Sequence, residues 1–260
     1  MQPNHMLRDA LNRLNNGQIS LDEAVKEIEG LRIDAVGDFA RLDLGRQLRC
    51  GIPEVVLAEG KEPVHLAEIA IHHAEVAGRC LISRITPVQQ DIIREKSSKK
   101  GLHFQCHEAA KMVVLSAPGA PAPAATGGVI GIITAGTSDI GVAEEAKVIA
   151  EEMGCRVCTA YDVGAAGIHR LFPAIKDLLD AHVFIVAAGR EGTLPAVVAG
   201  LVDRPVIGVP VSSGYGYMGQ GRAALASMLQ SCSVLAVVNI DSGFTAGAFA
   251  ARIANMVVSK

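Results

Sequence analysis

The chain has 260 residues, enough for one large domain or two modest ones, and half of them are hydrophobic, so a sizeable core is available. Aromatic residues make up 3% and tryptophan is absent, which argues against base-stacking platforms for single-stranded nucleic acid; a net charge of −3 without a basic stripe argues against duplex binding. No apolar run reaches the length of a membrane span, and the polar N-terminus lacks the apolar core of a signal peptide. We therefore expect a cytoplasmic protein with no membrane or nucleic-acid partner.

The first half predicts an exposed acidic helix followed by a small α/β unit. Residues 20–31 begin with Ser20 and carry Glu23 three positions later, which is a capping box. Strand-like and helical patterns then alternate, as in an α/β fold. In chain order the patterns are a strand at 54–60, a helix at 63–78, a strand at 80–85, a helix at 86–100 and strands at 102–106 and 112–116.

A linker separates this region from the second half. Residues 116–128 are rich in Pro, Ala and Gly and have no hydrophobic periodicity, which is typical of a linker. We therefore divide the chain into a helical arm with a small α/β domain (1–115), the linker (116–128) and a second domain (129–260).

The second domain alternates apolar strands with helices. Strands are predicted at 128–136, 155–161, 183–189, 204–211 and 234–240, with helices between them and a last helix from about residue 244. Continuous apolar strands joined by helices predict a parallel sheet covered on both faces. The fold class is thus α/β, with a three-layer, doubly wound parallel sheet preceded by a smaller α/β region.

The six cysteines are expected to be thiols in a reducing compartment. Cys155 and Cys158 form a lone C-x-x-C with no partner pair at zinc spacing. Their stretch is a predicted strand, in which positions three apart point to opposite faces, so we interpret both as ordinary sheet residues. Four histidines have no convincing ligand geometry and are expected to be structural: His72, His73, His103 and His107.

Gly-, Ser- and Thr-rich loops follow the first four strands of the second domain. Ligands of doubly wound sheets bind beyond the carboxyl ends of the strands, where glycines such as Gly136 and Gly189 allow the backbone close to a ligand. Helix N-termini behind these loops favour anions. The pattern predicts a phosphate-bearing ligand, but neither a P-loop nor a dinucleotide fingerprint is present, which disfavours ATP hydrolases and redox Rossmann enzymes.

Polar side chains of these loops are candidate site residues. Asp139 and Glu191 could act as bases or hold a metal, or they could be acids facing a helix N-terminus. Thr137 and Ser138 could bind phosphate or cap the helix. Three residues of the second loop and two at a strand end of the first domain are further substrate-binding candidates: Asp162, His169, Arg170, Glu59 and Lys61.

Three stretches, "GVIGIITAGTSDIGVAEEA", "VFIVAAGREGTLPAVVAGL" and "RPVIGVP", resemble N5-carboxyaminoimidazole ribonucleotide mutase and aminoimidazole ribonucleotide carboxylase. The whole chain more closely resembles a related family, the carboxylase/hydrolases of nickel-pincer cofactor synthesis, or pyridinium-3,5-biscarboxylic acid mononucleotide synthases. That likeness includes "GIPEVVLAEGK", "DVGAAGIHRL" and "SCSVLAVVNIDSGFTAGAFAARI".

The resemblance implies a function for Cys232. Members of the related family carboxylate the pyridinium ring of nicotinic acid adenine dinucleotide at C5 and cleave its phosphoanhydride, releasing AMP. A thiolate that adds at C6 makes C5 nucleophilic toward carbon dioxide, and Cys232 occupies the matching position. From the residues alone, Cys232 could equally be a small core hydrophobe. The resemblance further implies a homo-oligomer, an octamer in relatives, carbon dioxide or bicarbonate as co-substrate, and no tightly bound cofactor, with Mg²⁺ the one candidate.

One departure weakens a purine assignment. The purine mutases keep a histidine after the second strand, where this chain has Tyr161, and a phenol with a pKa near 10 cannot shuttle protons at neutral pH as an imidazole can. A purine-type carboxylase or mutase remains the alternative, and a nucleotide-binding scaffold without activity is a third interpretation.

Overall fold

The computed structural model describes residues 3–259, and the contacts within the chain divide it into two compact units. One unit comprises residues 1–106 and 113–120, and the other comprises residues 107–112 and 121–260. The main division falls between Ala120 and Pro121, inside the segment expected as a linker, where residues 117–128 form neither helix nor strand.

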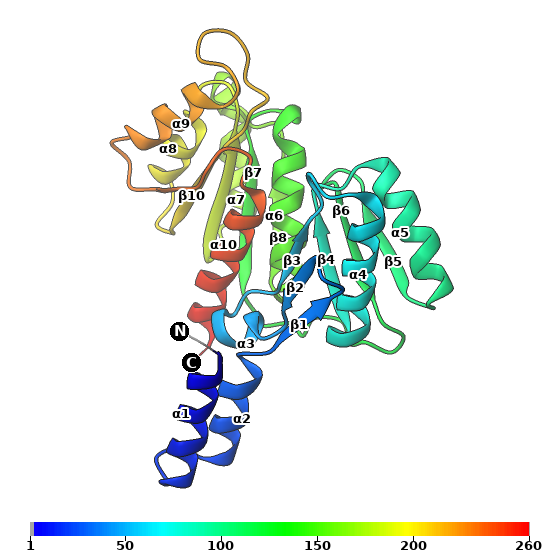
Figure 1. The fold of residues 1–260 in the computed structure, drawn as a ribbon. Helices are drawn as coiled ribbons and strands as arrows, with labels where there is room; N and C mark the ends of the chain where they lie inside the picture. The colour runs from blue at the N-terminus through cyan, green and yellow to red at the C-terminus, as the bar shows by residue number, and fades with distance from the viewer. Residues whose placement is uncertain (1–2, 260) are drawn as a thin grey trace. The chain divides into compact units, whose positions relative to one another are not determined.

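The first half of the chain contains a helical pair, a small antiparallel ribbon and a four-stranded sheet (Figure 1). Its elements are α1 (Pro3–Asn15), α2 (Leu21–Glu29), β1 (Ile33–Val36), β2 (Ala40–Asp43), α3 (Arg46–Cys50), β3 (Val55–Leu57), α4 (Pro63–Ala77), β4 (Arg79–Ser83), α5 (Pro87–Lys99), β5 (His103–His107) and β6 (Met112–Ser116). The sheet order is β3-β4-β6-β5, and β1 pairs with β2. The capping box expected at Ser20 and Glu23 is present at the start of α2.

The second unit is the predicted doubly wound α/β domain. Its elements are β7 (Val129–Thr134), a 3-10 turn η1 (Thr137–Asp139), α6 (Ile140–Glu152), β8 (Arg156–Ala160), a 3-10 segment η2 (Ala165–Arg170), α7 (Leu171–Asp177), β9 (Val183–Ala188), α8 (Leu194–Ala199), β10 (Val206–Pro210), α9 (Arg222–Leu229), β11 (Ala236–Val237) and α10 (Gly243–Val258). None of the described helices combines the length and the apolar character that crossing a bilayer requires.

The five strands of this unit are parallel, in the order β11-β10-β9-β7-β8. The chain starts in β7, places β8 on one side and then returns to build β9, β10 and β11 on the other. This is the flavodoxin-like order, and the direction of winding changes between β7 and β9. The carboxyl ends of these two neighbouring strands therefore form the switch point at which such sheets bind ligands.

Both faces of the sheet are covered, as the continuous apolar strands predicted. Alternate residues of β9, Phe184 and Val186, belong to a core with side chains from α7, α8 and α9. On the opposite face α6 and α10 pack against each other and against β7 and β9. The fold class predicted from the sequence is confirmed.

The last strand is shorter than the sequence predicted. A strand was expected over residues 234–240, but β11 contains just Ala236 and Val237. Val234 lies before this short edge strand and is 95% exposed. The apolar run from Val234 to Val238 is therefore a partly solvent-facing segment rather than a buried strand.

Candidate functional site

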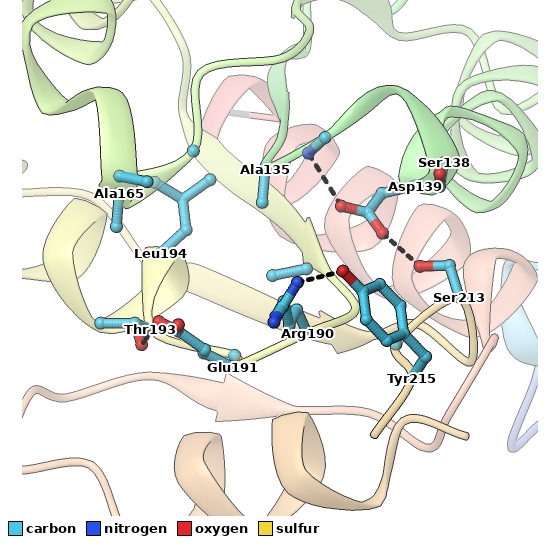
Figure 2. Close-up of a pocket in the computed structure, with 16 residues that line it drawn as sticks. Ala135, Ser138, Asp139, Ala165, Arg190, Glu191, Thr193, Leu194, Ser213 and Tyr215 are labelled. Atoms are coloured by element: carbon cyan, nitrogen blue, oxygen red, sulfur yellow. Dashed lines mark hydrogen bonds between the residues drawn. The ribbon is translucent and has the colours of Figure 1, made fainter. Parts of the chain in front are cut away.

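A cavity of about 290 Å³ lies at the switch point, in the loops that follow β7, β8, β9 and β10 (Figure 2). The polar or charged side chains among the described residues that line it are Ser138, Asp139, Arg190, Glu191, Thr193, Ser213 and Tyr215. The remaining lining is glycine and alanine with Leu194, so few large side chains project into the cavity. Its position agrees with the sequence expectation that the site lies beyond the carboxyl ends of the strands.

Asp139 is the best-anchored charged group of the cavity. Its side chain is 4% exposed; one carboxylate oxygen accepts a hydrogen bond from the Gly136 backbone N–H at 2.9 Å, and the other accepts one from the Ser213 hydroxyl at 2.8 Å (Figure 2). Burial raises the pKa of the Asp139 carboxyl above its ordinary value, while the bonds from Ser213 and Gly136 limit the rise. A fixed carboxylate with a raised pKa is suited to accept a proton.

Gly189 makes this arrangement possible. A Cβ atom at this position would lie 2.2 Å from the Ser213 hydroxyl oxygen and 2.9 Å from a carboxylate oxygen of Asp139. Any larger residue would displace the hydrogen bond between those two side chains. The expected glycine at position 189 is thus required by close packing beneath the site, whereas a Cβ at Gly136 would meet its nearest neighbour at an ordinary 3.7 Å.

The other expected carboxylate, Glu191, lies on the exposed rim. It follows Arg190 directly and accepts a long hydrogen bond of 3.5 Å from the Thr193 hydroxyl. Both Glu191 and Arg190 line the cavity. Glu191 is accessible to a ligand but is not held in place as Asp139 is.

Thr137 and Ser138 form the turn η1 between β7 and α6, and both are exposed. Ser138 lines the cavity, whereas Thr137 is outside its lining. The cap of this turn is made by Asp139, which accepts the Gly136 N–H. The side chain that caps this turn is therefore Asp139, and not Thr137 or Ser138.

The three candidates of the second loop are not drawn into the cavity. Arg170 forms an ion pair with Asp162 at 2.7 Å, and their side chains are 43% and 49% exposed, respectively. His169 is exposed, and none of the three lines the cavity described here. The part of this loop that does line it is the small-residue run Gly164–Ala166.

Tyr161 does not line the cavity and is hydrogen-bonded to a residue of α6. Its hydroxyl donates a hydrogen bond to Glu144 of α6, which also pairs with Lys147 at 3.4 Å. Burial, with the neighbouring Glu144 carboxylate, raises the pKa of the Tyr161 phenol above its ordinary value. A phenol with a raised pKa remains protonated at neutral pH, so it cannot take the place of an imidazole base.

The structure excludes one of the two interpretations of Cys232. The thiol is exposed, so it is not a core residue. It also lies on the loop from α9 into β11, ahead of the edge strand, and it is not among the residues that line the cavity. The next residue, Ser233, donates its hydroxyl to the Ala196 carbonyl of α8 at 2.9 Å and ties the loop to the helical layer. Cys232 is thus an exposed thiol outside the lining of this cavity, and its role as a nucleophile stays a prediction.

Glu59 and Lys61 belong to the other unit. Both are exposed, and Glu59 forms an ion pair with Arg84 at 3.1 Å. The Lys61 backbone carbonyl accepts a hydrogen bond from the Gln89 side chain at 2.9 Å, which fixes the turn after β3 while the Lys61 side chain stays in solvent.

The structure adds three residues that sequence reasoning missed: Arg190, Ser213 and Tyr215. The loops that carry them were identified, but Ser and Tyr in a Gly-rich loop are common and gave no reason to select one. Their roles depend on contacts between loops far apart in sequence. No group of three or more Asp, Glu, His or Cys side chains in residues 3–259 is arranged as a metal site, and both Asp139 oxygens are used within the protein.

Comparisons with known proteins agree with this architecture. A sequence model described as AIR carboxylase matches residues 129–259, and one described as a LarB/PurE-like N-terminal domain matches residues 33–117. An uncharacterized protein of Methanocaldococcus jannaschii is 44% identical over 256 residues, which cover 96% of this chain and 98% of that protein.

The purine enzymes match about half of this chain. N5-carboxyaminoimidazole ribonucleotide mutase of M. jannaschii is 35% identical over 127 residues, 47% of this chain and 76% of that enzyme. The Thermotoga maritima mutase is 32% identical over 132 residues, 48% of this chain and 73% of that enzyme.

Proposed function

Since this chain belongs to the AIR carboxylase family and is thus an enzyme of the carboxylase or mutase kind, we propose that it carboxylates the pyridinium ring of nicotinic acid adenine dinucleotide at C5 and hydrolyses the phosphoanhydride. The products are pyridinium-3,5-biscarboxylic acid mononucleotide, a precursor of the nickel-pincer cofactor, and AMP. The observation that carries the proposal is the combination of two matches on one chain: an AIR carboxylase domain and a LarB/PurE-like N-terminal domain.

The site supports this choice over the purine reaction. The position at which the resembled purine mutases keep a histidine holds Tyr161, whose hydroxyl is bound to Glu144 and whose pKa is raised. The described residues that line the cavity instead offer the carboxylates of Asp139 and Glu191, of which Asp139 is the one held in place by two hydrogen bonds. The pyridinium carboxylation needs a carboxylate base and a thiolate nucleophile, whereas the purine reaction needs an imidazole. The first reaction therefore fits the groups of this site better.

The proposed chemistry balances with a thiolate and a base. The Cys232 thiolate adds to ring C6 and forms a C–S bond, so the ring nitrogen takes up the electron pair and C5 becomes nucleophilic. C5 then forms a C–C bond with carbon dioxide. Asp139 removes the C5 proton, the nitrogen lone pair expels the thiolate, and the ring regains its aromaticity. Water cleaves the phosphoanhydride in a separate step, with any Mg²⁺ brought by the diphosphate.

The thiol must come from a neighbouring subunit in this proposal. Cys232 is exposed and outside the cavity lining of its own domain, and the apolar side chains Leu229 and Val234 near it are 66% and 95% exposed. Exposed apolar groups around a reactive side chain favour a contact with another copy of the chain. We therefore propose a homo-oligomer in which the Cys232 loop of one subunit approaches the cavity of the next.

A side-by-side turnover assay tests the function. Full-length protein is incubated with ¹³C-bicarbonate and either nicotinic acid adenine dinucleotide or aminoimidazole ribonucleotide, and the products are identified by mass spectrometry. We expect AMP and a labelled dicarboxylated mononucleotide from the dinucleotide, and no turnover of the purine substrate. Turnover of the purine substrate alone would replace the proposal by the purine carboxylase or mutase reaction, and no turnover of either would favour a binding scaffold.

A further inference from the structure

Arg190 is the one cation among the described residues that line the cavity. The lining also holds two carboxylates, Asp139 and Glu191. No carboxylate of the described residues forms an ion pair with Arg190, although the arginine is exposed and Glu191 is its neighbour in sequence. A cation without an acidic partner, placed at the wall of a cavity, is available to an anionic ligand group.

Tyr215 fixes the orientation of this guanidinium. The Arg190 carbon Cζ lies 4.5 Å from the centroid of the Tyr215 ring, and Nη1 donates a hydrogen bond to the Tyr215 hydroxyl (Figure 2). Stacking on an aromatic face, together with this hydrogen bond, restricts the plane of the guanidinium. Less side-chain entropy is then lost when an anion binds.

The backbone on both sides of Arg190 is also constrained. Gly189 is packed against Ser213 and Asp139, and a Cβ at Gly192 would lie 2.4 Å from the Ala224 carbonyl oxygen. Gly192 has a φ of +69°, a conformation that side chains other than glycine rarely adopt. Because Gly189 and Gly192 are both in close contact with other parts of the domain, the backbone that carries Arg190 is restrained on either side.

The arrangement of charges points to the group that Arg190 recognises. The lining combines a buried carboxylate, Asp139, with an exposed cation, Arg190, that stacks on Tyr215. The lining between them is mostly small, and 290 Å³ is at the lower limit for a ligand pocket, so the cavity has room for one ring rather than a whole dinucleotide. A cationic ring with a carboxylate substituent would match both charges.

We infer that Arg190, oriented by Tyr215, is the specificity residue that binds the ring carboxylate of the substrate and so selects the acid over the corresponding amide. The inference rests on the proposed function for the identity of the ring. Arg190 forms two N–H···O bonds with the carboxylate, as is usual for planar guanidinium–carboxylate pairs. An uncharged amide cannot replace this pairing and leaves the guanidinium without an anionic partner.

Binding measurements test the inference independently of turnover. Isothermal titration calorimetry compares nicotinic acid adenine dinucleotide with nicotinamide adenine dinucleotide, which has the same phosphates but an amide on the ring. We expect the full-length wild type to bind the acid about tenfold more tightly, the difference that one charged hydrogen-bonded pair provides. Arg190→Gln should bind the acid about tenfold more weakly and the amide within about twofold of wild type, and Arg190→Lys should retain part of the preference.

Lys176→Gln is the matched control, because it removes the same charge at an exposed position of α7 outside the cavity. It should keep the wild-type preference. If Arg190→Gln weakens the binding of both dinucleotides equally, Arg190 contacts a phosphate and the inference is overturned. An Arg190→Gln variant that keeps the preference of the wild type for the acid would also overturn it. So would a wild type that binds neither dinucleotide, or that binds both with equal affinity. If the preference for the acid depends on Arg190 but the protein forms no carboxylated product, the inference is supported and the proposed function is contradicted.

Discussion

The cavity and the loop that carries Cys232 belong to the same domain but are held in different ways. The cavity has a buried carboxylate with two hydrogen bonds and a glycine in close contact beneath it. In the loop from α9 to β11, Cys232 and Val234 are exposed, and one side-chain bond from Ser233 anchors the segment to α8. The cavity is built by its own chain, whereas the loop that carries Cys232 leaves its thiol and apolar side chains exposed to solvent.

The largest expected effect comes from removing the thiol. Cys232→Ser should lower carboxylation by at least about 1,000-fold, because a hydroxyl at neutral pH is a far weaker nucleophile toward the ring than a thiolate. Dinucleotide affinity should stay within a few-fold, because serine is close to cysteine in size and Cys232 does not line the cavity of its own domain. The test combines turnover with intact-mass analysis for an adduct on Cys232.

Cys50→Ser is the control for that variant, since Cys50 is also an exposed thiol but lies in the first half of the chain. It should retain wild-type turnover. Full activity of Cys232→Ser would remove the thiol from the mechanism.

A methyl group beneath the cavity should have the next largest effect. Gly189→Ala forces a Cβ to within 2.2 Å of the Ser213 hydroxyl oxygen and displaces Asp139, and a displacement of about 1 Å can cost about 100-fold in rate. Gly200→Ala is the comparison, because its nearest neighbour would lie at an ordinary 3.5 Å. Turnover and thermal unfolding of both variants measure the difference; equal behaviour would mean that the Gly189 contact does not position the carboxylate.

A smaller effect is expected on the pH dependence. As a base, Asp139 acts when deprotonated, so activity falls as the pH drops through its raised pKa. The Ser213 bond stabilises the ionised form, and Ser213→Ala should raise that pKa further. The acid limb of the pH–rate profile should then move up by about one pH unit, the value of a hydrogen bond to a charged group. Ser212→Ala should not move it, and a limb at the same pH in both variants would exclude Asp139 as the base.

The smallest effect should come from the C-x-x-C pair. Cys155 is buried and its thiol lies 3.2 Å from the Asn255 side-chain oxygen, whereas Cys158 is in β8 beside the Arg156 guanidinium at 3.3 Å. Because the two thiols have separate protein neighbours, replacement of both by Ala should leave turnover within several-fold and remove no metal. Stoichiometric zinc in the wild type that is lost in this variant, measured by mass spectrometry of the metal, would contradict the interpretation.

Hydrophobic periodicity was sufficient to predict the doubly wound sheet and the loops that form the cavity. Asp139 was identified because it follows a predicted strand and Gly189 because it ends one, and the carboxyl ends of these strands meet at one edge. Arg190, Ser213 and Tyr215 were not, because their roles arise from contacts across loops. The extent of β11 was overestimated because the apolar run from Val234 reads as a buried strand, and an edge position is not visible in local sequence.

Mixed oligomers test most directly whether the cavity and Cys232 form one site from two subunits. Cys232→Ser and Asp139→Asn are each expected to be inactive, and the two are co-expressed with separable tags so that they assemble together. If the thiol serves a neighbouring cavity, random mixing restores about a quarter of the sites, because these combine an intact carboxylate from one chain with an intact thiol from the other. Mixed oligomers no more active than either parent would contradict the account.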